Sequence, residues 1–237
     1  MKQAPEKVPL SKLRKIIAKR MTGSLQSAAQ YTLHMEIDAT NLVACKAEAT
    51  EKAKKAGLKL SYTHMLVKIA AYVLERHPAL NANFFDDMMY LHQSKHIGVA
   101  ISLKEGLIVP IIKAVQEKSL TEIIEALRDL SEKAANGNLE INDVTGGTFT
   151  ISNLGSYGID SFTPILNLPE VAILGVNRIT KKPRILDGEI SNTDIIRFSL
   201  TVDHRVIDGV VAAGFLKTLD ETLKDIDILR RLFELQR

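Results

Sequence analysis

Residues 200–209 read Leu200-Thr201-Val202-Asp203-His204-Arg205-Val206-Ile207-Asp208-Gly209. In this segment the end of a predicted strand is followed by a histidine, and then by an acid-glycine pair that precedes a predicted helix. Apolar and polar residues alternate along 195–202, which predicts a strand with one buried face. The acid-glycine pair then precedes an apolar run over 210–219, and this order predicts a sharp turn into a helix. A neutral imidazole accepts a proton near pH 7, so His204 at the end of the strand is a candidate catalytic base.

A glycine-rich and hydroxyl-rich segment, residues 146–158, reads Gly-Gly-Thr-Phe-Thr-Ile-Ser-Asn-Leu-Gly-Ser-Tyr-Gly. Its first half predicts a strand over 148–152, so Ser152 and Asn153 would present a hydroxyl and an amide where the strand ends. Gly155 and Gly158 would let the backbone approach a ligand closely. The segment is neither a P-loop nor a dinucleotide fingerprint. The alternative interpretation is a surface turn made of good turn formers.

Together His204 and Ser152 indicate acyl transfer. The histidine would activate a nucleophile, and the hydroxyl would donate to the oxyanion that develops. Ser152 does not lie in a Gly-x-Ser-x-Gly elbow, so the nucleophile is expected to come from a substrate.

The remaining segments predict a mixed α/β domain without the strict alternation of a doubly wound sheet. Capping residues mark two helices: Ser11 at the start of 11–29, and a capping box from Ser119 to Glu122 that opens 119–136, which Gly137 ends. The other predicted helices are 40–56, 63–77, 209–223 and 226–235. The predicted strands are 31–38, 97–103, 107–110, 148–152, 171–176 and 195–202, with a turn at 104–106 and a hairpin turn at Asp187-Gly188.

Composition narrows the class of protein. The 237 residues carry a formal net charge of +3, too small to indicate nucleic-acid binding, and no apolar run is long enough for a membrane span. Cys45 has no second cysteine to pair with, which favours a reducing cytoplasm. His92 and His96 are spaced like metal ligands but fall in predicted strand and loop, so no metal is expected. Residues 1–9 read as a linker, and 10–237 as one domain.

Segment 201–209 resembles the Asp-His-Arg-x-x-Asp-Gly signature of dihydrolipoamide acyltransferases, the core (E2) of 2-oxoacid dehydrogenase complexes. Further segments agree with that family in the same order, so that the resemblance covers residues 9 to 235: they are 9–21, 106–110, 147–155, 162–167 and 169–176.

The resemblance implies a chloramphenicol-acetyltransferase-like fold, a mixed sheet flanked by helices, that assembles as a homotrimer and then as an octahedral or icosahedral core. It implies an active-site channel between subunits, with coenzyme A entering at one end and lipoamide at the other. His204 would be the base, and Ser152 of the neighbouring subunit would hold the oxyanion. Asp208 would be a buried ion-pair member that orients the histidine loop. The residues implied on the coenzyme A side are Lys46, Ser61, Ser102, Asn153 and Ser156.

By the same resemblance, the partners are lipoyl domains and the E1/E3 components of such complexes, and 1–9 would be the linker that follows a lipoyl domain. Segment 229–235 would be a hydrophobic anchor between trimers. The expected acyl group is acetyl, as in acetoin-cleaving and pyruvate systems, with branched-chain acyl and succinyl groups as alternatives. A scaffold without catalysis and an antibiotic acetyltransferase of the same fold are the rival functions. A scaffold would be expected to lack the histidine, and a drug acetyltransferase would need a hydroxyl acceptor.

Overall fold

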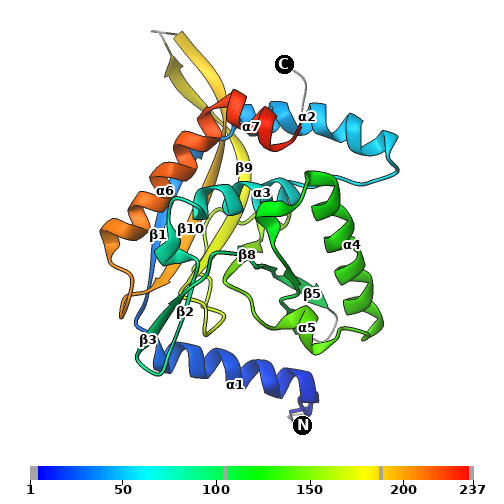
Figure 1. Cartoon of the computed structure of the whole chain (residues 1–237), viewed down its shortest axis with the longest axis vertical. Helices are drawn as coiled ribbons and strands as arrows, with labels where there is room; N and C mark the ends of the chain where they lie inside the picture. The colour runs from blue at the N-terminus through cyan, green and yellow to red at the C-terminus, as the bar shows by residue number, and fades with distance from the viewer. Residues whose placement is uncertain (1–4, 104–105, 187–188, 235–237) are drawn as a thin grey trace.

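The computed structural model describes residues 5–103, 106–186 and 189–234, and a six-stranded sheet forms its centre (Figure 1). Figure 1 shows α1 at the opposite end of the molecule from α2 and α7. In chain order the elements are α1 (Lys12–Ser27), β1 (Gln30–Asp38), α2 (Thr40–Lys55), α3 (Tyr62–Leu74), η1 (Pro78–Leu80), β2 (Ala82–Phe85), β3 (Met88–Leu91), β4 (Ile97–Val99), β5 (Ile101–Leu103), β6 (Gly106–Ile108), β7 (Ile111–Ile112), η2 (Val115–Glu117), α4 (Leu120–Asn136), α5 (Ile141–Val144), β8 (Phe149–Asn153), η3 (Gly155–Tyr157), β9 (Ala172–Leu186), β10 (Glu189–Asp203), α6 (Gly209–Lys224) and α7 (Ile226–Leu232).

The main sheet has the order β1-β10-β9-β8-β4-β7. β10 runs antiparallel to both β1 and β9, whereas β8 runs parallel to both β9 and β4. This mixed sheet confirms the expected α/β class. β1 pairs only with residues 195–203 of β10, so the far ends of β9 and β10 extend as a two-stranded arm (Figure 1).

One face of the sheet forms the hydrophobic core with α2, α3 and α6. On β10 the side chains of Phe198, Leu200 and Val202 are fully buried there, each contributing about 1.5–3 kcal/mol of burial free energy. The residues between them point to the opposite face, which is polar. There Ser199 Oγ lies 2.9 Å from Nδ1 of His34 on β1. The alternation that predicted a strand is therefore the alternation between these two faces.

Two further apolar groups belong to this core. Cys45 of α2 is fully buried, and burial, with Glu48 as a smaller cause, raises the pKa of its thiol. Leu229 and Phe233, at the end of the chain, are also buried in the core. Within one copy these two side chains pack against the chain's own core, and the expected role of 229–235 as an anchor between trimers stays a prediction. Residues 235–237 lie outside the described part of the chain.

Most predicted elements are present, and several have different bounds. Ser11 Oγ accepts the Arg14 N–H at the start of α1, and the capping box from Ser119 to Glu122 opens α4. The predicted strand 97–103 is divided into β4 and β5, and β9 and β10 are much longer than predicted. The β2–β3 hairpin was not predicted. The expected turns at 104–106 and Asp187-Gly188 fall wholly or largely on residues outside the description.

No helix within the described residues is both long enough and apolar enough to cross a membrane.

Candidate active site

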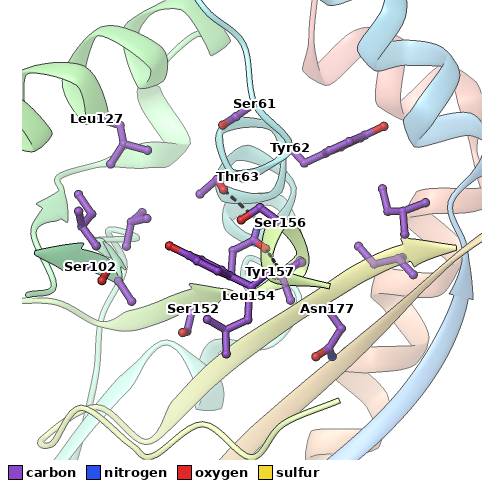
Figure 2. A pocket seen from close by; sticks show the side chains of 18 of the residues that line it. Ser61, Tyr62, Thr63, Ser102, Leu127, Ser152, Leu154, Ser156, Tyr157 and Asn177 are labelled. Atoms are coloured by element: carbon purple, nitrogen blue, oxygen red, sulfur yellow. Dashed lines mark hydrogen bonds between the residues drawn. The ribbon is translucent and has the colours of Figure 1, made fainter. Parts of the chain in front are cut away.

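A cavity of about 710 Å³ opens between the start of α3, helix α4, strand β5 and the end of β8 (Figure 2). Its lining mixes apolar side chains with hydroxyl groups and amides. It includes six of the residues expected to form the site: Lys46, Ser61, Ser102, Ser152, Asn153 and Ser156. Segments far apart in the sequence are thus brought to one site. His204 and Asp208 do not line this cavity.

The start of α3 is held by an unusual cap. Nδ1 of His64 accepts the backbone N–H of Ser61 at 3.0 Å and lies 3.1 Å from its hydroxyl. Burial lowers the pKa of His64 from 6.5 to about 4, so the ring is neutral at pH 7 and Nδ1 is free to accept. This cap places Ser61, Tyr62 and Thr63 at the cavity.

Lys46 reaches the same cavity from α2. Its ammonium group lies 4.9 Å from the centroid of the Tyr62 ring, a distance at which cation–π attraction operates. The sequence did not indicate Tyr62 or Thr63. The only signal was that hydroxyl-bearing residues cluster ahead of an apolar helix, and that pattern is also typical of an ordinary helix start.

The loop after β8 is fixed from within. Asn153 Nδ2 donates to the Thr63 hydroxyl at 3.1 Å, and Asn153 Oδ1 accepts the Gly155 N–H at 2.8 Å. A Cβ at position 155 would lie 2.7 Å from the backbone oxygen of Asn177. Each end of the Asn153 amide is thus bonded to one protein group, and its expected contact with coenzyme A stays a prediction. Gly155 permits close approach to the neighbouring strand β9.

Ser152 is the residue of β8 whose hydroxyl is free for a ligand. It is partly exposed and lines the cavity. Within the described residues, its Oγ has no side-chain hydrogen bond. A hydroxyl in that state can donate to an oxygen that enters the cavity.

His204 lies in the turn after β10. Its backbone N–H donates to the Ala29 carbonyl at 2.8 Å, and its ring packs on that of Tyr31 with 4.6 Å between centroids. Its side chain remains 53% exposed. The ring is therefore held along one side by Tyr31 and open on the other. Nothing in the sequence marked Tyr31, because this contact depends on the register between β1 and β10.

The turn is braced by a different acid from the one expected. Asp203 is fully buried and binds the Arg205 guanidinium, with Nη2 to Oδ2 at 2.6 Å and Nε to Oδ1 at 3.0 Å. These bonds raise the pKa of Arg205, and its guanidinium also lies over the Phe84 ring at 4.7 Å. The side chain of Asp208 is 85% exposed, with Oδ1 4.0 Å from His204 Nδ1. In this chain the buried ion pair thus belongs to Asp203.

The strand register separates His204 from Ser152. Ser152 on β8 is level with Gly175 on β9, and Gly175 is level with Ser199 on β10. His204 follows Ser199 by five residues and lies two strands away from β8. With about 4.8 Å between strands and about 3.3 Å per residue, roughly 15–20 Å separates the two residues. A single copy of the chain cannot bring both to one reacting atom.

His92 and His96, which are spaced like metal ligands, are each hydrogen-bonded within the protein. His92 Nε2 lies 2.7 Å from Asn83 Oδ1, and His96 Nδ1 accepts the Ala114 N–H at 3.0 Å. Burial is the main cause that lowers the pKa of His96. The two rings thus tie residues 92–96 to β2 and to the residue before η2.

A protein-family model matches residues 2–230: 2-oxoacid dehydrogenases acyltransferase (catalytic domain). Among curated proteins, the acetyltransferase component of the acetoin cleaving system of Bacillus subtilis is 37% identical over 224 residues, which are 94% of this chain and 56% of that protein. The acetyltransferase component of the pyruvate dehydrogenase complex of the same organism is 38% identical over 222 residues, 93% of this chain and 50% of that protein. The chain thus spans about half the length of these relatives.

Solved structures give the same family likeness. A dihydrolipoamide acetyltransferase of Azotobacter vinelandii, studied for the role of a serine, a histidine and an asparagine in its catalytic mechanism, is 36% identical with a TM-score of 0.91; the match covers 96% of this chain and 95% of that one. The cubic core of a pyruvate dehydrogenase multienzyme complex gives the same values. A chloramphenicol acetyltransferase, 15% identical with a TM-score of 0.56, covers 87% of this chain and 94% of its own, and shares the fold alone.

Proposed function

Because the chain belongs to the catalytic-domain family of the 2-oxoacid dehydrogenase acyltransferases, we propose that it transfers an acyl group between a dihydrolipoyl thiol and coenzyme A. One observation carries the proposal. Ser152, His204 and Asp208 are separated along this chain by the same numbers of residues as the serine, histidine and asparagine studied in the Azotobacter vinelandii enzyme. The third position is an aspartate here.

The chemistry follows from the two side chains. His204 takes the proton of the coenzyme A thiol, which matters because a free thiol with a pKa of about 8.5 is mostly protonated at pH 7. The thiolate attacks the carbonyl carbon of the acyl-dihydrolipoyl thioester, and the Ser152 hydroxyl donates to the oxyanion. The carbon–sulfur bond to the dihydrolipoyl group then breaks, and His204 returns its proton to the departing thiolate. Acyl-CoA and dihydrolipoamide are the products.

The site is proposed to lie between two copies of the chain. Ser152 and His204 are too far apart within one copy, and the exposed side of His204 leaves room for a neighbour. A homotrimer provides three such interfaces. We further propose that trimers assemble into a larger core, because a structure that this chain resembles over 96% of its length is the cubic core of a multienzyme complex.

Substrates and partners follow from the lining and the relatives. Lys46, Ser61, Ser102 and Ser156 would contact coenzyme A, with the Lys46 charge suited to a phosphate. Acetyl is the proposed acyl group, because both curated relatives described above are acetyltransferase components. Lipoyl domains and the other enzymes of such a complex are the proposed partners. The single thiol of Cys45 fits the reducing cytoplasm.

The test is acyl transfer to dihydrolipoamide from acetyl-CoA, isobutyryl-CoA and succinyl-CoA. We expect acetyl transfer, reduced about 10²–10⁴-fold in His204→Ala and about 10²–10³-fold in Ser152→Ala. A variant that loses the Ser119 cap, Ser119→Ala, is the control because it lies outside the site. If the folded, oligomeric protein transfers none of the three groups, the proposal is wrong and the scaffold function takes its place.

A further inference from the structure

The carboxyl group of Glu170 is sealed inside the protein without a cation. Its residue is 2% exposed, and within the described part of the chain no lysine, arginine or histidine lies within ion-pair distance of it. Burial raises its pKa from 4.5 to about 7. An acid buried in this way costs free energy that an apolar residue of similar size would not. The free-energy cost of this burial indicates that a hydrogen-bond acceptor at position 170 has a specific role.

Both carboxyl oxygens of Glu170 accept hydrogen bonds, one from Thr150 on β8 and one from Asn167 in the loop before β9. Thr150 Oγ1 donates to Oε2 at 2.5 Å, and Asn167 Nδ2 donates to Oε1 at 3.0 Å. A Cβ at Gly147, just before β8, would lie 2.5 Å from Oε1, so the glycine makes room for the carboxyl group. Thr150 precedes Ser152 by two residues and therefore shares its face of the strand. The acid thus holds the side chain next to Ser152 on that face.

The backbone around Glu170 fastens the other half of the proposed site. The Val171 carbonyl accepts the N–H of Asp203, the residue before His204, at 3.0 Å. On the other side the Pro169 carbonyl accepts the Phe84 N–H at 2.8 Å, and Phe84 carries the Arg205 guanidinium on its ring. The Glu170 segment is therefore bonded to the strand of Ser152 and to the turn of His204.

We propose that Glu170 is a positioning residue for acyl transfer, which sets the place of the Ser152 hydroxyl through its hydrogen bond with Thr150. This inference rests on the proposed function. Since Ser152 has no side-chain partner of its own among the described residues, its place is decided by the backbone of β8. An oxyanion donor acts only within about 2.7–3.1 Å of the oxygen it stabilises, and a displacement of about 1 Å costs on the order of 10²-fold in rate.

The experiment compares Glu170→Leu, Thr150→Val and the double variant with Glu170→Gln. Thr150→Val and Glu170→Leu each remove the same hydrogen bond, and each is expected to lower kcat by about tenfold to a hundredfold with KM for acetyl-CoA within about twofold. The double variant should be no slower than the slower single one, because one interaction is lost only once. Glu170→Gln keeps an acceptor for Thr150 and should retain kcat within about threefold.

Thr222→Val is the matched control. Thr222 is as buried as Glu170, and its hydroxyl donates at 2.7 Å to a carbonyl of its own helix, α6. It should lower the melting temperature without changing kcat. If the Glu170 and Thr150 variants behave like this control, Glu170 is only structural and the inference is overturned.

Amide hydrogen exchange of residues 149–153 separates this inference from the proposed function. Both Glu170→Leu and Thr150→Val should speed exchange in β8 beyond the Thr222→Val control. If the wild type is inactive but β8 loosens in this way, the acyltransferase proposal fails while the link from Glu170 to the Ser152 strand holds. If exchange in β8 is unchanged, the link itself is absent.

Discussion

At the scale of single residues, the two acids near His204, Asp203 and Asp208, are expected to differ in their effect on stability. Asp203 is buried against Arg205, and Asp208 is exposed beside the imidazole ring. Asp203→Asn is expected to lower the free energy of unfolding by about 3 kcal/mol, near the lower end for a broken buried pair because the Arg205 side chain can still reach water. Asp208→Asn should change it by less than about 1 kcal/mol.

Urea unfolding at pH 7 checks both values. Asp208→Asn should also keep kcat within about tenfold, since the Azotobacter vinelandii enzyme carries an asparagine at the equivalent spacing. Equal losses of stability in the two variants would contradict the prediction that Asp203 stabilises the fold and Asp208 does not.

At the scale of elements, helix α3 carries a pH-sensitive start. His64 has a pKa of about 4 in the folded protein and 6.5 when exposed, so the unfolded chain binds more protons between these values. Its contribution to stability is therefore complete above pH 6.5 and is lost as the pH falls toward 4, by up to about 3 kcal/mol. Protonated Nδ1 can no longer accept the Ser61 N–H, so the hydrogen bond that caps the start of α3 is lost.

His64→Gln is the control for this effect, because a glutamine oxygen can accept the same N–H and does not titrate. The difference in unfolding free energy between wild type and His64→Gln, measured by denaturant titration at several pH values, should shrink on acidification. A difference that stays constant from pH 8 to pH 4.5 would exclude His64 as the cause.

The elements also show where sequence patterns are sufficient. Caps and alternation are local, so Ser11, the box at Ser119 and the buried face of β10 could be predicted. The outer halves of β9 and β10 could not. They extend beyond β1, expose both faces and therefore lack the apolar alternation that marks a half-buried strand, as Lys181-Lys182-Pro183 illustrates.

At the scale of the whole molecule, the proposed site predicts complementation between two inactive variants. The Ser152→Ala chain retains His204, and the His204→Ala chain retains Ser152. When both chains are unfolded together and allowed to reassemble, random mixing should restore roughly a quarter of the wild-type activity, because one interface in four pairs the two retained residues. Each variant reassembled alone is the control. Activity no higher than these controls would place both residues in one chain's own site.

Contacts that form only in the whole molecule are the parts of the site that the sequence could not reveal. Motifs identified Ser152 and His204, but their separation depends on the register of three strands, which no local pattern encodes. For the same reason, no local sequence pattern indicates a role for Tyr31 or Glu170. The partner of Tyr31, His204, lies in the turn after β10, and the partner of Glu170, Thr150, lies on β8, so each contact exists only once the sheet has formed.

The burial of Cys45 has a consequence for the protein's own chemical durability. Under the proposed function the protein works among thioesters and dithiols, which could acylate an exposed cysteine thiol or draw it into a mixed disulfide. The one sulfhydryl of this chain is sealed in the core, and burial keeps it in the unreactive protonated form. The fold therefore presents the proposed thioester and dithiol substrates with no competing thiol.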